Sequence, residues 1–386
     1  RLILAGPDDH RDPAALVQLI REQQVNVVQF VPALLQQFLE VAEVGECSSL
    51  TDVFCGGGAL TAALVRSVRE HLPQVRLHNV YGPTEATVDS TVWTLEANSP
   101  VPQGAPPIGK PLCNTRVYIL DTHQQPTPLG VVGEMYLGGV QVARGYLNRP
   151  ELSAERFLDD PFSDQPGARL YRTGDVARYL ADGNIEYLGR NDDQVKIRGL
   201  RIELGEIQAH LAQVDGVREA AVLAREDVSG DQRLVAYYSG ELVETDQLRS
   251  QLLKHLPAYM VPAVFVNLPA LPLSPNGKLD RQALPAPDQT ALLSREYEAP
   301  IGEVETVIAG IWAELLKVER VGRFDHFFEL GGHSLLAVNL VARMRRAGLS
   351  ADIRVLFGQP TLAALAAAVG GEPEAPVPAN LIPADC

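Results

Sequence analysis

Short apolar runs alternate with helix-like segments over the first 95 residues, and this rhythm constrains the fold more than any other feature. The runs are rich in β-branched residues and are bounded by glycine, proline or polar residues. Strands are expected at 1–5, 26–31, 52–57 and 76–82, and helices from Pro13, Pro32 and Thr61. Strands that alternate with helices predict βαβ units on a largely parallel sheet.

Two loops follow strands of this expected sheet, and ligands on such sheets bind beyond the carboxyl ends of the strands. The first loop is 56–59 and the second is YGPTE, 81–85. In the second, Tyr81 offers a stacking face, the Thr84 hydroxyl suits a phosphate, and Glu85 suits Mg²⁺. An ordinary β-turn also accounts for these residues, so the loop by itself leaves both interpretations open.

The pattern changes near residue 100 and again near residue 191. Short β-rich pieces separated by Gly/Pro turns predict a barrel-like or meandering β region up to Tyr187. A small α+β unit is expected next, and it closes on the hairpin turn Asn276–Gly277. After a polar linker, one apolar helical face runs from Val304 to Leu315, and further helices are expected at Ser334 and after Thr361.

Four further residues are candidates for a functional role, and for each of them a purely structural role is the alternative. Asp175 follows a glycine turn and can accept both hydroxyls of a ribose, or it satisfies its own turn. Gly199 interrupts a basic strand and permits close approach of a ligand, or the segment is a solvated hairpin. Lys278 can supply charge to an anionic transition state, or it is a solvated turn lysine. Ser334 suits a modification site or a helix cap.

Charge and cysteine content exclude several classes of protein. There are 33 Lys and Arg against 48 Asp and Glu, and the net charge of −15 argues against a nucleic-acid partner. No apolar run approaches the ~20 residues that span a bilayer, so no membrane partner is expected. The four cysteines and eight histidines show no disulfide or metal spacing, which fits a reducing cytoplasm. The chain has neither a signal peptide nor an initiator Met, and we expect it to begin inside a larger polypeptide.

Six strings in a fixed order carry a specific resemblance that extends over nearly the whole chain. They are YGPTE, GEMYLGGVQVARGYL, YRTGD, GRNDDQVKIRGLRIELGEI, NGKLDR and DHFFELGGHSLL. This order resembles the adenylation and peptidyl-carrier domains of nonribosomal peptide synthetases, the ligases of secondary metabolite biosynthesis. The resemblance implies that an amino acid and ATP give an aminoacyl-adenylate and pyrophosphate. The aminoacyl group would then pass to the thiol of 4'-phosphopantetheine on Ser334.

The resemblance also implies roles for individual residues. Those that would bind ATP or AMP are Gly57, Gly58, Ala59, Asn79, Tyr81, Thr84, Asp175 and Arg190. Glu85 would hold the Mg²⁺, and Lys278 would stabilise the adenylation transition state. Asp192 would be the hinge about which a small domain rotates between the two half-reactions. Gly199 would help to form the tunnel for the pantetheine arm.

The family positions that line the amino-acid pocket can be located in part. They fall on Gln29, Phe54, Gly56, Val80, Val88 and Asp89, with Lys278 reaching the substrate carboxylate. A Gln side chain can pair with an amide, and this lining is similar to that of glutamine-activating domains. The sequence therefore predicts glutamine as the substrate, with glutamate as the second choice.

The fold that the resemblance implies is multidomain. It comprises part of an α/β adenylate-forming large domain with a β-barrel-like part, a small α+β domain, and an all-α carrier bundle of four-helix type. The predicted ranges are 1–191 for the large subdomain, 192–284 for the small mobile subdomain, 285–298 for a linker, 299–370 for the carrier, and 371–386 for a linker toward a condensation domain. The expected partners are an amino acid, a phosphopantetheinyl transferase and neighbouring condensation domains, in a bacterial cytoplasm.

One departure from the family pattern affects the predicted activity. The family's Ser/Thr/Gly-rich phosphate loop and the aspartate that pairs with the substrate amine lie upstream of YGPTE, and the chain contains neither. We therefore expect the 386-residue chain by itself not to form an adenylate. An acyl-CoA-synthetase-like ligase is the nearest enzyme alternative, and a non-catalytic carrier and docking fragment is the alternative of a different class.

Overall fold

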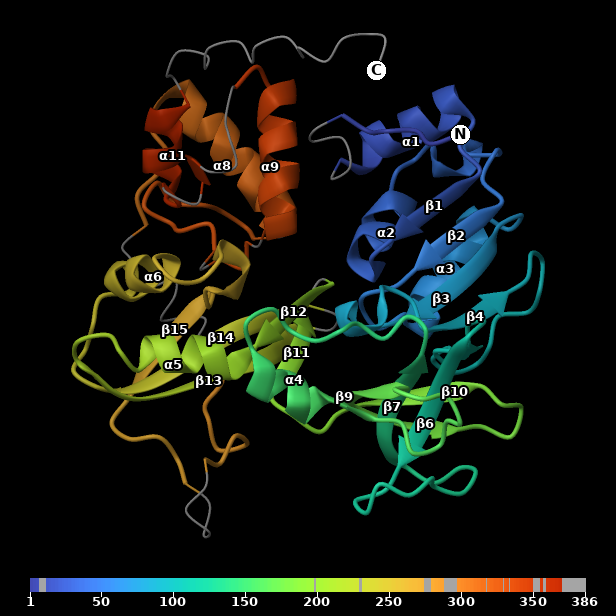
Figure 1. Cartoon of the computed structure of the whole chain (residues 1–386). Coiled ribbons are helices and arrows are strands. Elements are labelled where there is room, and N and C mark those ends of the chain that lie inside the picture. Colours follow the sequence, from blue (N-terminus) through green and yellow to red (C-terminus); the bar gives the residue numbers. More distant parts are fainter. Residues whose placement is uncertain are drawn as a thin grey trace, which may run out of the picture. The chain divides into compact units, whose positions relative to one another are not determined.

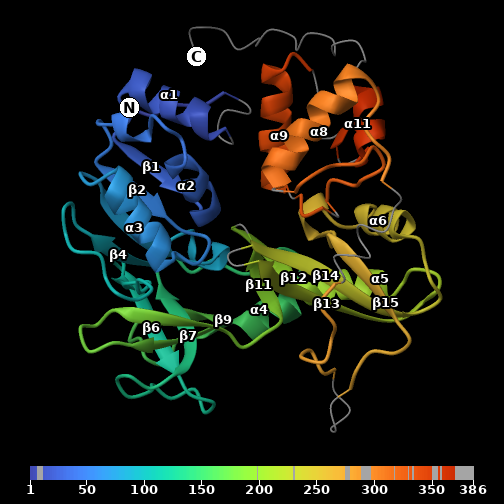
Figure 2. The same ribbon diagram turned by 180° about the vertical axis from the view of Figure 1, so that it is seen from behind.

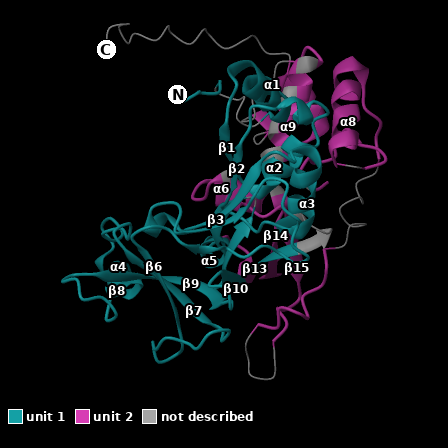
Figure 3. Ribbon diagram, turned by 90° about the vertical axis from the view of Figure 1, so that its right-hand side faces the viewer, with its two compact units in different colours: residues 1–213, 222–233 teal, residues 214–221, 234–386 magenta. Residues whose placement is uncertain are grey.

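The structure is a computed structural model in which two compact units are distinguished (Figure 3). The described residues are 1–6, 12–197, 199–228, 231–273, 279–287, 297–316, 318–328, 330–332, 334–349, 355–356 and 359–369. One unit comprises 1–213 and 222–233, and the other comprises 214–221 and 234–386. The domain boundaries drawn from the sequence stay predictions.

The first sheet of unit 1 confirms the expected βαβ rhythm (Figure 1). Its five strands lie in the order of the chain: β1 (Val27–Phe30), β2 (Asp52–Cys55), β3 (Arg76–Tyr81), β4 (Thr91–Leu95) and β5 (Lys110–Pro111). The first three are parallel, and β4 and β5 run antiparallel to their neighbours. The carboxyl ends of β1, β2 and β3 therefore meet at one edge of the sheet.

Two helices connect the parallel strands, α2 (Pro32–Leu39) between β1 and β2 and α3 (Ala62–His71) between β2 and β3, while α1 (Pro13–Gln23) precedes β1. Local chemistry fixes where they begin, because Asp12 accepts from the backbone of Ala14 and Thr61 accepts from that of Leu64. Their apolar sides pack with the strands into one core. The strand expected at 1–5 is wrong: residues 1–6 have no regular secondary structure and join no ladder, and strands need a hydrogen-bonded neighbour.

The expected β region is an antiparallel meander with the strand order β10-β9-β7-β6. Its strands are β6 (Thr115–Leu120), β7 (Gly133–Gly139), β9 (Arg169–Tyr179) and β10 (Ile185–Arg190), while β8 (Phe157–Asp159) pairs with β9 after α4 (Pro150–Arg156). A hairpin of β11 (Gln194–Ile197) and β12 (Leu200–Glu203) then leads into α5 (Leu204–Leu211).

Unit 2 contains most of the small α+β elements and the helical carrier region (Figures 1 and 2). The α+β elements are β13 (Val217–Val228, shared with unit 1), β14 (Asp231–Gly240), α6 (Thr245–Leu253) and β15 (Val264–Leu268), with strand order β13-β14-β15. The described carrier helices are α8 (Gly302–Leu316), α9 (Ser334–Arg346) and α11 (Leu362–Ala368). They pack around the buried rings of Trp312 and Phe327, whose centroids lie 5.1 Å apart.

A buried carboxylate joins three strands of the first sheet. Asp52 on β2 accepts from Arg76 Nη2, 2.9 Å away, and its Oδ1 lies 2.8 Å from His78 Nε2. The other ring nitrogen of His78 lies 2.9 Å from the hydroxyl of Thr94 on β4. Burial alone would raise the pKa of Asp52, but the bonds from Arg76 and His78 lower it to about 2.

We predict that Asp52→Asn lowers the free energy of unfolding at pH 7 by about 1–3 kcal/mol. The folded-state pKa of Asp52 lies below its ordinary value of 3.8, so its charge stabilises the fold above about pH 4 and loses this effect as the pH falls toward 2. Urea denaturation measures the difference in unfolding free energy between variant and parent. Trp312→Phe is introduced into both, so that Trp93 is the one tryptophan of the chain whose fluorescence is followed.

The matched control is Glu70→Gln, which removes an exposed carboxylate on α3. It should leave the unfolding free energy within about 0.5 kcal/mol of the parent. A deficit of Asp52→Asn that stays the same at pH 7 and at pH 2.5 would contradict the assignment to charge.

Candidate active site

The two loops singled out in the sequence lie side by side at the carboxyl edge of the first sheet. Cys55, the last residue of β2, is the register partner of Asn79, two residues before β3 ends, so the loop 56–59 and the turn η3 (Thr84–Ala86) follow neighbouring strands. Gly56 lies against the second strand: a Cβ there would be 2.6 Å from Val80 Cγ2. A side chain at position 56 would therefore displace Val80 on β3.

Four of the predicted pocket residues share one face of the sheet. Gln29 and Phe54 are register partners, and Gly56 and Val80 are in contact range at the same strand ends. Residues two apart on a strand point to the same side, so Phe54 and Gly56 project alike, as do His78 and Val80. The structure thus brings Gln29, Phe54, Gly56 and Val80 together.

His78 is a member of this face that sequence reasoning missed. It is the register partner of Phe54, and its ring stacks on the Phe54 ring with centroids 4.3 Å apart and an interplanar angle of 16°. Alternation along β3 was the available signal, since His78 lies two residues before Val80.

The remaining pocket candidates, Val88 and Asp89, lie in the segment between η3 and β4. Val88 has a φ of 72° and is 62% exposed. Asp89 is half-buried, and this burial raises the pKa of its carboxyl.

The opposite face of β3 presents the predicted adenine residues, Asn79 and Tyr81. The Asn79 amide donates to the carbonyl of Pro107 over 2.7 Å. The Tyr81 hydroxyl donates to Asp175 on β9. Burial raises the pKa of Tyr81 well above its ordinary value, and the charge of Asp175 adds to this. One strand therefore separates the predicted nucleotide residues from the predicted amino-acid residues.

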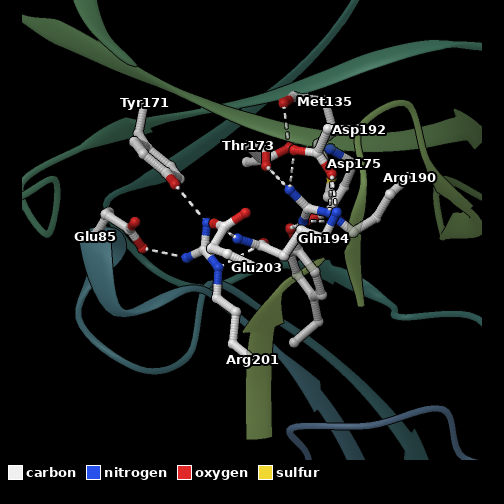
Figure 4. A network of polar contacts seen from close by, with 11 residues as sticks. Glu85, Met135, Tyr171, Thr173, Asp175, Arg190, Asp192, Gln194, Arg201 and Glu203 are labelled. Atoms are coloured by element: carbon white, nitrogen blue, oxygen red, sulfur yellow. Dashed lines mark hydrogen bonds and ion pairs between the residues drawn. The ribbon is translucent and has the colours of Figure 1, made fainter. Parts of the chain in front are cut away.

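Arg190 connects the predicted ribose site to the predicted hinge (Figure 4). Its Nη1 lies 2.7 Å from Asp175 Oδ1, and its Nε and Nη2 each donate to Asp192 over 2.6 Å. Burial would raise the pKa of Asp192, but the bonds from Arg190 lower it. A Cβ at Gly174, which has a φ of 74°, would lie 2.6 Å from Asp192 Oδ2, so glycine is required at this position. The glycine turn expected before Asp175 is wrong: Gly174 and Asp175 lie within β9, where the register with β7 shifts.

Glu85, the predicted Mg²⁺ ligand, is buried and has both carboxylate oxygens bonded. Oε1 accepts from the Tyr146 hydroxyl over 2.6 Å. Oε2 accepts from Arg201 Nη1 over 2.7 Å (Figure 4). Burial would raise the pKa of Glu85, but Tyr146 and Arg201 lower it. One carboxylate with phosphate oxygens and water suits Mg²⁺, so Glu85 fits the metal once Arg201 has left Oε2.

The hairpin β11–β12 contributes two cations that sequence reasoning missed. Lys196 Nζ lies over the Tyr81 ring, 5.2 Å from its centroid, and Arg201 bonds Glu85. Burial lowers the pKa of Lys196, although the charge of Asp175 opposes this. The basic residues within 196–201 were the available signal in the sequence.

Gly199, the predicted tunnel residue, lies close to the loop 56–59. Its φ is 81°, and a Cβ there would be 2.7 Å from Val31 Cγ1, while the Gly199 Cα lies 3.8 Å from a Cβ built on Gly57. Only glycine fits this conformation and this space without movement of the neighbour.

Three further predicted site residues are Thr84, Lys278 and Ser334. Thr84 is exposed in η3. Lys278 lies outside the described residues, as does the turn Asn276–Gly277. Ser334 is the first residue of α9, and its side chain lies outside the described part of the chain. Within the residues that the structure describes, no three His, Cys, Asp or Glu side chains are grouped to hold a metal, so Glu85 would act as a single protein carboxylate.

Comparison with known families and proteins gives a consistent result. Residues 1–147 match the AMP-binding enzyme model, 206–278 its C-terminal domain, and 306–369 the phosphopantetheine attachment site model. The chain is 47% identical over 390 residues to malpibaldin synthetase of Mortierella alpina, and 48% identical over 368 residues to tyrocidine synthase 3 of Brevibacillus parabrevis. These matches cover 100% and 95% of the chain but only 7% and 6% of the relatives.

A solved structure of PA1221, described as an NRPS protein containing adenylation and PCP domains, superimposes with a TM-score of 0.70 at 31% identity. The match covers 92% of this chain and 59% of PA1221. The chain belongs to the nonribosomal peptide synthetases and carries adenylation-domain sequence followed by a peptidyl carrier domain. The matched families imply 4'-phosphopantetheine, and ATP with Mg²⁺, as cofactors. No helix in the described part of the chain is long and apolar enough to cross a bilayer.

We predict that Glu85 and Arg201 are coupled by about 1–3 kcal/mol in a double-mutant cycle of Glu85→Gln and Arg201→Gln at pH 7. The coupling should fade as the pH falls below the lowered pKa of Glu85, because protonation removes the Glu85 charge. Urea denaturation followed by Trp93 fluorescence gives the unfolding free energies from which the coupling is calculated.

A second pair serves as the control for this cycle. Arg178 and Glu186 lie 2.5 Å apart but are 40% and 37% exposed, so solvent screens them and their coupling should be below about 1 kcal/mol. Equal coupling free energies in the two pairs would contradict the claim that burial strengthens the Glu85–Arg201 pair.

Proposed function

We propose that this chain takes part in activating an amino acid as its adenylate and in carrying that amino acid as a thioester on Ser334. The observation that carries the proposal is the meeting of Tyr81, Asp175 and Arg190 in one bonded cluster, in a chain that continues into a carrier domain. The cluster supports a site for an adenosine, because a stacking ring and a carboxylate for ribose hydroxyls lie together.

Each site residue is proposed to bind a different part of the reactants. Asn79 and Tyr81 would hold the base, Asp175 and Arg190 the ribose, and Thr84 the phosphate. Glu85 would hold Mg²⁺ after Arg201 has moved away from its Oε2. Phosphopantetheine, when bound to Ser334, supplies the thiol that accepts the aminoacyl group. Lys278, which lies outside the described residues, would supply positive charge to the adenylation transition state.

Glutamine is the proposed substrate. Gln29 and Phe54 are neighbours on the pocket face, and a primary amide on Gln29 can exchange hydrogen bonds with a substrate amide. Asp89 adds negative charge to the predicted lining, which favours a neutral amide over the carboxylate of glutamate. A longer chain that includes the family's phosphate loop should therefore exchange pyrophosphate faster with glutamine than with glutamate.

The proposed partners are a phosphopantetheinyl transferase and the condensation domains of a larger synthetase. The relatives named above come from a fungus and a bacterium, so an origin in a bacterial cytoplasm remains a prediction.

We predict that incubation with a phosphopantetheinyl transferase and CoA adds the mass of one phosphopantetheine to the chain. Ser334→Ala should abolish the gain, because it removes the only atom proposed as the acceptor. Intact mass spectrometry measures it, and Ser67→Ala on α3 is the control that should be modified like the parent. A gain that persists in Ser334→Ala would assign the arm to another residue.

We also predict that the 386-residue chain catalyses no ATP–pyrophosphate exchange, because the family's phosphate loop is not in its sequence. Exchange of labelled pyrophosphate into ATP measures this with glutamine present. Robust exchange by the chain alone would refute the prediction and leave the carrier test unaffected.

A further inference from the structure

A guanidinium in unit 2 lies between two aromatic rings from different parts of the sequence. Arg249 on α6 is only 9% exposed. Its guanidinium carbon is 6.0 Å from the ring centroid of Phe265 on β15 and 5.7 Å from that of Phe328 in the carrier region. Both distances fall within the range in which a cation is attracted to the face of a ring.

The small α+β part of unit 2 holds Arg249 in position. Its Nη2 donates to the backbone carbonyl of Ala263 over 3.4 Å, immediately before β15. Leu248 and Leu252, its neighbours on α6, are buried in the small α+β part. The guanidinium is therefore held by the small sheet and its helix, and the Phe328 ring lies against it.

Phe328 belongs to the turn that leads to the proposed attachment site. Its carbonyl accepts from the amide of Gly331 over 3.3 Å, and the amide of Gly332 donates to the carbonyl of Phe327 over 2.8 Å. A Cβ at Gly332 would lie 2.4 Å from the Phe327 ring, so this turn is tightly packed. It ends two residues before Ser334, where α9 begins.

We propose that Arg249 docks the chain's own carrier on α6 through Phe328, and that this docking restricts access of a modifying enzyme to Ser334. An enzyme that modifies Ser334 has to approach the start of α9, and the adjoining turn is the part that Arg249 contacts. Docking and modification therefore compete. The inference rests on the proposed role of Ser334.

The test is the rate at which a phosphopantetheinyl transferase and CoA modify the unmodified full chain, followed by intact mass spectrometry. Arg249→Gln removes the cation, and the rate should rise by between about 2-fold and about 30-fold, the factor that corresponds to a cation–π contact. Arg249→Lys keeps a cation and should give an intermediate rate. Lys254→Gln, which removes an exposed cation just after α6, should leave the rate unchanged.

A second measurement keeps the proposal testable if Arg249→Gln disturbs the small sheet. Phe328→Leu retains an apolar side chain in the carrier core but removes the ring, and it should accelerate modification by a similar factor. Hydrogen exchange of α6 and of 323–332 should rise in both variants. Equal rates and equal exchange in the parent and both variants would overturn the docking role, whereas no modification of any chain would instead refute the proposed function.

Discussion

The guanidinium of Arg190 is the group on which the site in unit 1 most depends. It joins Asp175 on β9 to Asp192 in the turn before β11, and its side chain is only 8% exposed. A buried charge of this kind is stable only when it is fully paired, and removal of one partner typically costs about 3–5 kcal/mol. Because Tyr81 also donates to Asp175, the same pair fixes the ring that faces the proposed adenine site.

Side chains alternate between the two faces of β3, and this alternation separates the proposed nucleotide site from the proposed amino-acid pocket. Asn79 and Tyr81 point to one side of β3, and His78 and Val80 point to the other. A nucleotide and an amino acid can therefore be held on opposite sides of a single strand, with their reacting groups meeting at its carboxyl end. The Asp52–His78–Thr94 contacts set the ring of His78 against Phe54 and so stabilise the face proposed for the amino acid.

Cations on the hairpin β11–β12 occupy positions that a bound nucleotide and metal would need. Arg201 neutralises Glu85, and Lys196 covers the ring of Tyr81. Since two cations do not share a carboxylate oxygen favourably, Mg²⁺ and Arg201 exclude one another at Oε2 of Glu85. In this arrangement the predicted hinge residue Asp192 lies two residues before the hairpin, where a change of backbone angles would move both cations together.

The sequence by itself determined the elements and the family. Periodicity and caps placed α1, α3 and the parallel strands, and motif order identified adenylation and carrier sequence, because these signals are local. Tertiary structure decided the rest. The strand expected at 1–5 did not form, since a strand depends on a partner that sequence pattern cannot supply. The contacts of Arg201 with Glu85 and of Lys196 with Tyr81 span more than 100 residues, and only folding brings such distant groups into contact.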